Sequence, residues 1–332
     1  MGLLAIITLV TSTLISSMSD ALTLNDVQQA RQRIASCVRR TPLVPSATLS
    51  ERLKTNVYAK LELFQKTGSF KVRGTFNKAL SLAPEIHAKG LVAVSGGNHA
   101  LAVAYTGRAL DLAATVLMPE SSPATIQEAT RGYGASVKFA ANAADAFAQI
   151  AELERDGWIY LHPFDDPVLM AGQGTLALEI LDDVPQVTDI VLSVGGGGMM
   201  AGVGTVIKAL KPSVRLWGVE TQGADSMARS LAAGKIVTLD AMTSVARSLG
   251  AAAPSERTFA MARQFLESVT VVSDKDAVDA ARYLLDRLKV LAEPAASCTF
   301  AAATRLQGQF SAGKHVVLLL SGGNVTLDAL AI

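Results

Sequence analysis

The sequence predicts an α/β fold of two domains, each an open twisted sheet with helices on both faces. Short continuous apolar stretches, such as 91–94, 114–118 and 316–320, alternate with helical patterns along the chain. Strands of this kind are buried on both faces and are typical of parallel sheets. The chain has 332 residues, of which 50% are hydrophobic. A single core usually stops growing below that length, so we expect two domains.

The expected elements follow one another with few interruptions. Apolar residues at helical spacing predict a first helix over 25–38. After the expected strand at 114–118, Ser122 and Pro123 supply an N-cap and a first helical residue for the next helix. Strands are expected over 57–62, 91–94, 114–118, 137–140, 158–161, 190–194, 215–220 and 316–320. Further helices are expected over 102–110, 174–181, 200–210, 225–233 and 276–288. Another alanine-rich helix, after the strand at 137–140, is expected to end at Arg155.

The first seventeen residues form an apolar stretch that resembles the core of a signal peptide. No Lys or Arg occurs before Arg31, so the positively charged start of such a signal is missing. The stretch is also too short to span a bilayer. We therefore expect Met18 to be the physiological start and residues 1–17 to be an upstream extension, with a cleaved signal peptide as the alternative.

The overall composition argues against several classes of partner. Thirty basic and 29 acidic side chains leave a net charge of +1, without a block of like charge that would hold nucleic acid. Cys37 and Cys298 lie far apart, and the histidines lack ligand spacing, so neither a disulfide framework nor a zinc site is indicated. We expect a cytoplasmic protein without a membrane partner.

Three glycine-rich turns, 95–99, 195–198 and 321–324, each follow an apolar strand and precede an expected helix start. Such corners expose convergent N–H groups and bind anions, although any one alone is often only a tight turn. Four consecutive glycines require a reason, because each costs about 1 kcal/mol within a helix. Close approach of a phosphate is such a reason. A dinucleotide site is the alternative, with Glu220 at the expected distance, but it leaves Lys71 and the other two turns unexplained.

A set of motifs in this chain resembles the threonine/serine dehydratase and serine racemase family. That family belongs to the tryptophan-synthase-β-like, fold type II, pyridoxal phosphate enzymes. The motifs occur in the family's order from about Leu24 to Leu327, nearly the whole chain. They are Gly-Ser-Phe-Lys-Val-Arg-Gly at 68–74, Ser-Gly-Gly-Asn-His at 95–99, His-Pro-Phe-Asp-Asp-Pro at 162–167, Gly-Gln-Gly-Thr at 172–175, Gly-Gly-Gly-Gly-Met at 195–199, Ala-Glu-Pro at 292–294 and Ser-Gly-Gly-Asn at 321–324.

The resemblance implies pyridoxal 5'-phosphate as the cofactor. Lys71 would hold it as a Schiff base and exchange the Cα proton of the substrate. Phe70 would pack on the pyridine ring, and Asn98 would bind the ring hydroxyl. The implied cofactor-binding residues are Phe70, Lys71, Asn98, Gly195, Gly196, Gly197, Gly198, Met199, Glu293 and Ser321. The implied substrate-binding residues are Ser95, Gly96, Gly97, Asn98 and His99.

The resemblance also implies the reaction. Ser321 would meet the pyridine nitrogen, and a hydroxyl, unlike a carboxylate, does not keep that nitrogen protonated. Elimination is then favoured over transamination. We expect a lyase that converts L-threonine or L-serine to a 2-oxo acid and ammonia. A larger cofactor-binding domain over 18–89 and 166–332, a small inserted domain over 90–165 and a homodimer are expected with it.

Two departures from the family's pattern keep alternatives open. Racemases of the family carry a serine where Gly96 stands, and glycine has no side chain to donate a proton, which disfavours an amino-acid racemase. Glu220 matches the first acidic residue of the family's divalent-cation site, but Ser226 stands where the second is expected, next to Asp225. Glu220 and Ala224 are the candidate ligands for magnesium, calcium or manganese. The alternative for Glu220 is a capping carboxylate.

The third departure is at 244–249, Ser-Val-Ala-Arg-Ser-Leu, where typical dehydratases of the family read close to Thr-Ile-Ala-Asp-Gly-Leu. Arg247 replaces the acidic residue. It either faces solvent or caps a helix, or it recognises a second carboxylate or another uncommon β-substituent of the substrate. Substrates such as 3-hydroxyaspartate or 3-phenylserine are therefore alternatives to threonine and serine. A non-catalytic small-ligand module is a further alternative, which the co-occurrence of the cofactor motifs disfavours.

Overall fold

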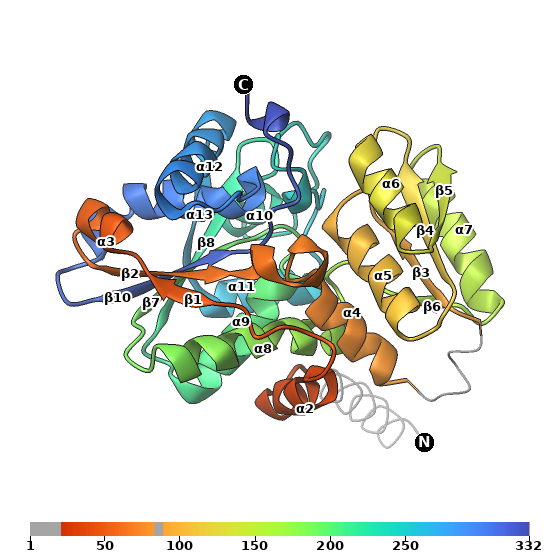
Figure 1. Cartoon of the computed structure of the whole chain (residues 1–332), viewed down its shortest axis with the longest axis horizontal. Helices are drawn as coiled ribbons and strands as arrows, with labels where there is room; N and C mark the ends of the chain where they lie inside the picture. The colour runs from red at the N-terminus through yellow and green to blue at the C-terminus, as the bar shows by residue number, and fades with distance from the viewer. Residues whose placement is uncertain (1–20, 83–88, 332) are drawn as a thin grey trace, which may run out of the picture.

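The computed structural model describes residues 21–82 and 89–331, which contain two separate sheets (Figure 1). The larger sheet has the strand order β1-β2-β10-β7-β8-β9 and the smaller one β5-β4-β3-β6. All neighbouring strands are parallel except β1, which runs antiparallel to β2. This confirms the predicted α/β fold with parallel sheets. The strands are β1 Leu43–Pro45, β2 Asn56–Leu61, β3 Leu91–Val94, β4 Ala114–Pro119, β5 Ser136–Ala140, β6 Ile159–Tyr160, β7 Asp189–Ser193, β8 Arg215–Thr221, β9 Leu266–Val272 and β10 His315–Leu320.

Helices cover both faces of each sheet. In the larger sheet, Val191 and Leu318 belong to a core beneath α3, α12 and α13, while Ile190 and Leu319 belong to a core beneath α2, α8, α9 and α11. Successive side chains of a strand point to opposite faces, which explains the continuous apolar strands. The helices are α2 Leu24–Ile34, α3 Ala47–Leu53, α4 Lys71–Leu80, α5 Asn98–Ala109, α6 Ala124–Gly132, α7 Ala143–Arg155, α8 Pro167–Asp183, α9 Gly198–Leu210, α10 Ser226–Ala233, α11 Glu256–Phe265, α12 Asp274–Leu288 and α13 Pro294–Arg305.

Several boundaries differ from the prediction for local reasons. Helix α8 begins at Pro167 rather than 174, because Asp166 caps it by accepting from the N–H groups of Val168 and Leu169. Ser122 is not an N-cap, because its hydroxyl donates to the Pro119 carbonyl at 2.7 Å and α6 begins after Pro123. The turn at 321–324 leads to no α-helix in the described residues that follow it, so that helix start was wrong. The elements β1, α3, α4, α11, β9 and α13 were not predicted.

The strands of the smaller sheet all lie between 91 and 160, and those of the larger sheet lie outside that range. The domain boundaries at 90 and 165 stay a prediction. Figure 1 shows α4 and α5 between the two sheets. Residues 1–17 and Met18 lie outside the described residues. Within the described ranges, no helix combines the length and the apolar character that crossing a bilayer requires.

A cluster of buried charges, which we call the buried ion cluster, joins four elements beneath α4. It consists of Lys60, Glu62, Arg73 and Glu179, each at most 7% exposed. The Arg73 guanidinium donates to both Glu62 oxygens at 2.8 and 2.9 Å and to both Glu179 oxygens at 2.7 and 3.0 Å. The Lys60 ammonium donates to Glu179 at 2.5 Å. Burial alone would raise the pKa of Glu179, but Arg73 and Lys60 lower it below its usual value.

We expect Arg73→Leu to lower the free energy of unfolding by about 3–5 kcal/mol, because two buried carboxylates lose their main partner. Denaturant unfolding measures this loss. The matched control is Lys275→Ala, which removes an ion pair whose lysine side chain is 82% exposed and should cost about 0.5 kcal/mol or less. Equal losses in the two variants would contradict a structural role for the buried ion cluster.

Candidate active site

Lys71 is the first residue of α4, and the loop before it is tied to the turn at 321–324. Ser69 forms an antiparallel bridge with Gly322. The Phe70 N–H donates to the Ser321 carbonyl at 3.1 Å, and the Gly323 N–H donates to the Gly68 carbonyl at 2.9 Å. The structure therefore brings together two of the motifs, 68–74 and 321–324, that lie far apart in the sequence.

The Lys71 amine lies in a partly buried position between the two sheets. Its Nζ donates to the Pro163 carbonyl at 2.7 Å and lies 5.3 Å from the centroid of the Phe70 ring. Burial lowers the pKa of Lys71 to about 8, and the Glu293 carboxylate opposes that shift. The neutral form, which a nucleophile or a base needs, is therefore far more accessible near neutral pH than in an ordinary lysine.

Asn98 is the centre of a hydrogen-bond network beside Lys71. Its Nδ2 donates to Glu293 Oε1 at 2.7 Å and to Ser248 Oγ at 3.1 Å, and its Oδ1 accepts from Asn324 Nδ2 at 2.7 Å. Ser248 Oγ also donates to Glu293 Oε2 at 3.0 Å. Burial raises the pKa of Glu293 to about 7, against the effects of Asn98, Ser248 and Lys71. The network unites the motifs at 95–99, 292–294 and 321–324.

Two members of this network, Ser248 and Asn324, were not predicted as site residues. Asn324 is the last residue of a motif that had been singled out, so its presence in that motif was the available signal. The sequence gives no comparable signal for Ser248. Ser248 lies in the stretch 244–249 next to the charged Arg247, and a lone serine carries no pattern that identifies it.

The glycine run 195–198 lies between β7 and the first turn of α9. Gly197 is the N-cap of α9 with φ +92°, a conformation that favours glycine. The first N–H groups of a helix have no partner within the helix and form a site for anions. A Cβ at Gly196 would lie 2.2 Å from the Phe164 ring, and one at Gly198 would lie 2.7 Å from the Phe164 carbonyl. Side chains at 196 and 198 would clash with Phe164, which requires glycine there, and the N–H groups at the start of α9 fit a phosphate group.

Ser321 directly follows β10 and is 4% exposed. Its hydroxyl oxygen lies 3.4 Å from that of Ser193, at the end of β7. Both hydroxyl groups stand at the carboxyl edge of the larger parallel sheet, where open α/β sheets bind their ligands. Ser321, Phe70, Lys71 and Asn98 are thus brought to one place, as predicted, and their donors and apolar ring fit a pyridine cofactor. Their individual roles toward it stay a prediction.

The turn at 95–99 connects β3 to α5. Ser95 Oγ accepts from the Gly97 N–H at 3.2 Å. The His99 ring is buried against the Leu161 carbonyl, with Nε2 at 2.7 Å from that oxygen, and burial lowers the pKa of His99 to about 3. His99 is therefore neutral. A Cβ at Gly96 would lie 2.3 Å from Ser122 Oγ, so the Ser122 hydroxyl fills the space of a side chain at position 96.

Arg247 begins the 3-10 turn Arg247–Leu249, η4, and extends toward the smaller sheet. Its side chain is exposed, and Nη1 donates to the Ser121 carbonyl at 3.3 Å. Ser121 is the neighbour of Ser122, which contacts Gly96. On the other side, a Cβ at Gly195 would lie 3.0 Å from Leu249 Cα. The η4 turn therefore contacts residues next to two of the glycine turns.

Glu220 and Ala224 lie apart from the Lys71 network. Glu220 is fully buried, and its carboxylate accepts from the N–H groups of Met227 at 3.1 Å and Ala228 at 2.7 Å. The Glu220 carboxylate therefore caps the first turn of α10. Burial raises the pKa of Glu220 to about 8. The Ala224 N–H donates to the Thr221 carbonyl at 2.9 Å. The part of the chain that the structure describes contains no group of three or more His, Cys, Asp or Glu side chains that could hold a metal ion.

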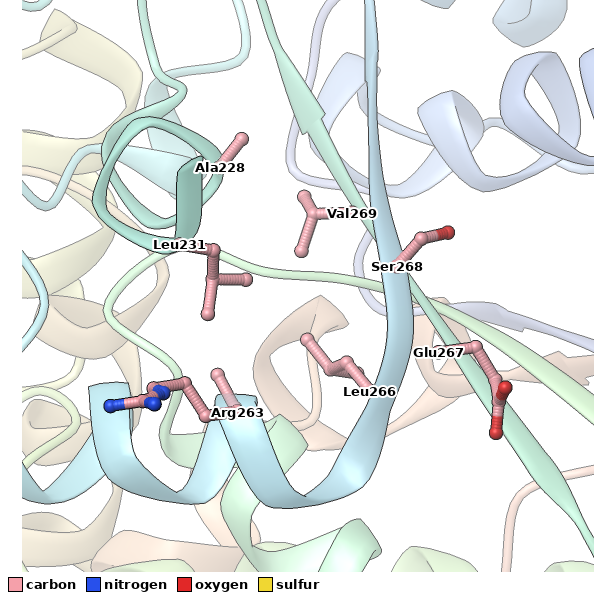
Figure 2. A pocket seen from close by; sticks show the side chains of 8 residues that line it. Ala228, Leu231, Arg263, Leu266, Glu267, Ser268 and Val269 are labelled. Atoms are coloured by element: carbon pink, nitrogen blue, oxygen red, sulfur yellow. The ribbon is translucent and has the colours of Figure 1, made fainter. Parts of the chain in front are cut away.

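A hollow of about 320 Å³ lies between α10, α11 and β9, and none of the predicted site residues lines it (Figure 2). Leu231, Leu266 and Val269 form its apolar wall, and Arg263 and Glu267 are its charged residues. The chemistry-bearing residues lie elsewhere, around Lys71.

Comparison with known proteins identifies relatives over nearly the whole chain. The chain is 37% identical to the catabolic L-threonine dehydratase of Staphylococcus aureus over 326 residues, 97% of this chain and 94% of that protein. Among solved structures, maize serine racemase superposes with a TM-score of 0.89 at 33% identity, covering 94% of this chain and 96% of that one. The serine racemase of Dictyostelium discoideum superposes with a TM-score of 0.86 at 32% identity, covering 92% and 99%.

These similarities confirm the predicted fold, which is the tryptophan-synthase-β-like fold type II. The match to the family extends over residues 34–322 and so includes Lys71, all of the glycine run and Ser321. This chain belongs to the family of pyridoxal-phosphate dependent enzymes.

Proposed function

We propose that this chain is an ammonia-lyase that converts L-threonine or L-serine to a 2-oxo acid and ammonia. The observation that carries the proposal is the Lys71 amine, which has a pKa of about 8 and lies beside the Asn98 and Glu293 network. The names of relatives support the substrate, since the Staphylococcus aureus protein is an L-threonine dehydratase and a Thermotoga maritima relative, 36% identical, is an L-threonine ammonia-lyase.

The residues present fit the cofactor. The N–H groups at the start of α9, from Gly197 to Met199, would hold its phosphate, and Phe70 would pack against its ring. Asn98 and Ser321 would bind polar atoms of the ring, and Lys71 would hold its aldehyde carbon. When bound, pyridoxal phosphate supplies an electron sink that stabilises negative charge at the substrate Cα.

Residues of this chain would bind the substrate and accept its Cα proton. The turn at 95–99 would bind the substrate carboxylate through its N–H groups at the start of α5. The neutral Lys71 Nζ would accept the Cα proton. The β-hydroxyl then leaves as water, and a water molecule is consumed when the nitrogen leaves as ammonia. The 2-oxo acid and ammonia therefore account for all atoms of the substrate.

An amino-acid racemase is the second candidate, because solved structures that superpose on this chain include serine racemases. Gly96 has no side chain to protonate Cα from the face opposite Lys71. The Ser122 hydroxyl fills the space of a side chain at Gly96, but it donates its hydrogen to the Pro119 carbonyl. We favour the lyase, and a homodimer and a cytoplasmic location are proposed with it.

Lys71→Ala should remove the long-wavelength absorbance of bound cofactor. It should also lower ammonia release by about 100-fold or more, because both the anchor and the proton acceptor are lost. The measurement is an ammonia assay with serine, threonine, 3-hydroxyaspartate and 3-phenylserine, together with chiral analysis of the remaining amino acid. Lys66→Ala is the control, since Lys66 stacks over Tyr105 outside the network. Inverted amino acid without ammonia would favour the racemase, and full activity of Lys71→Ala would refute both.

We also propose that Arg247 lets the enzyme accept a substrate with a second carboxylate, such as 3-hydroxyaspartate, in addition to threonine and serine. The Ser121 carbonyl takes one of the five N–H donors of a guanidinium. Arg247→Ala should then lower kcat/KM for 3-hydroxyaspartate by about 10-fold or more, as expected for a lost charge-assisted hydrogen bond. The value for serine should change little. If both substrates lose equally, Arg247 only connects η4 to Ser121.

We propose, third, that a divalent cation binds at Glu220 and Ala224. The buried Oδ1 of the adjacent Asp225 supports this, since it has no hydrogen-bond partner among the described residues. Magnesium, calcium or manganese at pH 8 should raise the thermal unfolding midpoint of the wild type and leave that of Glu220→Gln unchanged. A wild-type midpoint that does not respond to any of the three ions would exclude the cation.

Without a cation, the same variant tests the pKa of Glu220. A folded-state pKa of about 8, against about 4.5 when unfolded, means that the folded protein binds the extra proton between these values. Stability from this group is therefore lost as the pH rises through about 8. Glu220→Gln should remove that part of the pH dependence, so the plot of its thermal unfolding midpoint against pH should be flatter than that of the wild type between about pH 5 and pH 8.

A further inference from the structure

Ser248 lies at the point where the Asn98 and Glu293 network meets solvent. Ser248 is exposed, whereas Asn98 and Glu293 are buried, each only 5% exposed. Its hydroxyl nevertheless makes two hydrogen bonds to these buried groups, one as an acceptor from Asn98 Nδ2 at 3.1 Å and one as a donor to Glu293 Oε2 at 3.0 Å. Any molecule that reaches Asn98 from the Ser248 side meets this hydroxyl first.

The hydrogen-bonding capacity of the Asn98 amide nitrogen is fully used in this arrangement. The nitrogen has two hydrogens, and they go to Glu293 Oε1 at 2.7 Å and to Ser248 Oγ at 3.1 Å. Asn98 Oδ1 accepts from Asn324, whose own Nδ2 is also held by the Thr67 carbonyl at 2.8 Å. The Asn98 side chain therefore cannot turn without breaking bonds to three other segments of the chain.

The two bonds of the Asn98 nitrogen differ in strength. The one to Glu293 is shorter and has a carboxylate acceptor, and such bonds are roughly twice as strong as neutral ones. The one to Ser248 is longer and has a neutral acceptor. A new acceptor that approaches Asn98 would therefore take the hydrogen now bound to Ser248. The Ser248 hydroxyl can still donate to Glu293 after that exchange.

We propose that Ser248 is a positioning residue that holds the Asn98 amide in its resting orientation and gives up one N–H group to an oxygen of the cofactor. Ser248 thereby weakens cofactor binding slightly, because its bond to Asn98 must be exchanged. It also keeps Glu293 in place through the second bond. The inference rests on the proposed function, in which Asn98 binds a polar atom of the cofactor ring.

The donor bond from Ser248 to Glu293 has a separate electrostatic effect. Hydrogen bonds to a carboxylate stabilise its ionised form, and the Ser248 bond opposes the burial that raises the pKa of Glu293. Without the hydroxyl, the pKa of Glu293 moves further above its usual value. Glu293 is then protonated over a wider pH range and raises the pKa of Lys71 less.

The test is a titration of the dialysed, cofactor-free protein with pyridoxal phosphate at pH 8, followed by the absorbance of the bound cofactor. Ser248→Ala should bind it about 5-fold more tightly, the factor expected when one neutral hydrogen bond no longer competes. The pH midpoint of the bound-cofactor absorbance should also shift in Ser248→Ala. Ser248→Thr keeps a hydroxyl group and should restore both wild-type values.

Two comparisons distinguish this role from a general effect on folding. Ser81→Ala is the matched control, because Ser81 is also exposed and, among the described residues, its hydroxyl donates to the Lys78 carbonyl at 2.8 Å, near the end of α4. It should leave both the affinity and the pH midpoint unchanged. Unchanged or weaker cofactor binding by Ser248→Ala would overturn the inference. Absence of the absorbance from every protein, wild type included, would instead reject the proposed function.

Discussion

The buried ion cluster beneath α4 is the constraint on which the position of Lys71 depends. Arg73 lies two residues after Lys71 on the same helix, and its guanidinium is fixed by four bonds to Glu62 and Glu179. Glu62 follows β2 and Glu179 belongs to α8, so the start of α4 is tied to the larger sheet and to its covering helix. Removing charges from water is costly, and only well-formed partners offset that cost. The geometry of α4 is therefore closely specified.

That specified position decides the protonation of Lys71. Burial favours the neutral amine, whereas the Glu293 carboxylate favours the ammonium, and burial has the larger effect. Glu293 is itself buried, which raises its pKa to about 7, and the Asn98 and Ser248 hydrogen bonds and the Lys71 charge favour its ionised form. The protonation of Lys71 is thus coupled to a small set of hydrogen bonds that can exchange partners when a ligand arrives.

The sequence predicted most of this architecture because parallel strands and glycine turns have strong local patterns. It placed Lys71, the glycine run and the turn at 95–99 in one site through motifs. It could not predict contacts that depend on packing, such as Ser122 against Gly96 or Ser248 against Asn98, because single serines have no periodicity. The prediction of a helix after 321–324 was wrong for a related reason. That turn pairs with the loop at 68–70, and this tertiary contact overrides the local pattern.

The polar contacts between the two sheets converge on the same place as the chemistry. Lys71 reaches the Pro163 carbonyl, Arg247 reaches the Ser121 carbonyl, and Asn98 joins Glu293. Each of these bonds links a residue between 90 and 165 with one outside that range. A movement of one sheet relative to the other must therefore change the partners of Lys71 and Asn98. Conversely, a ligand that takes a hydrogen bond from either residue alters how the two parts are held together, so binding at this site and the relative placement of the sheets are energetically linked.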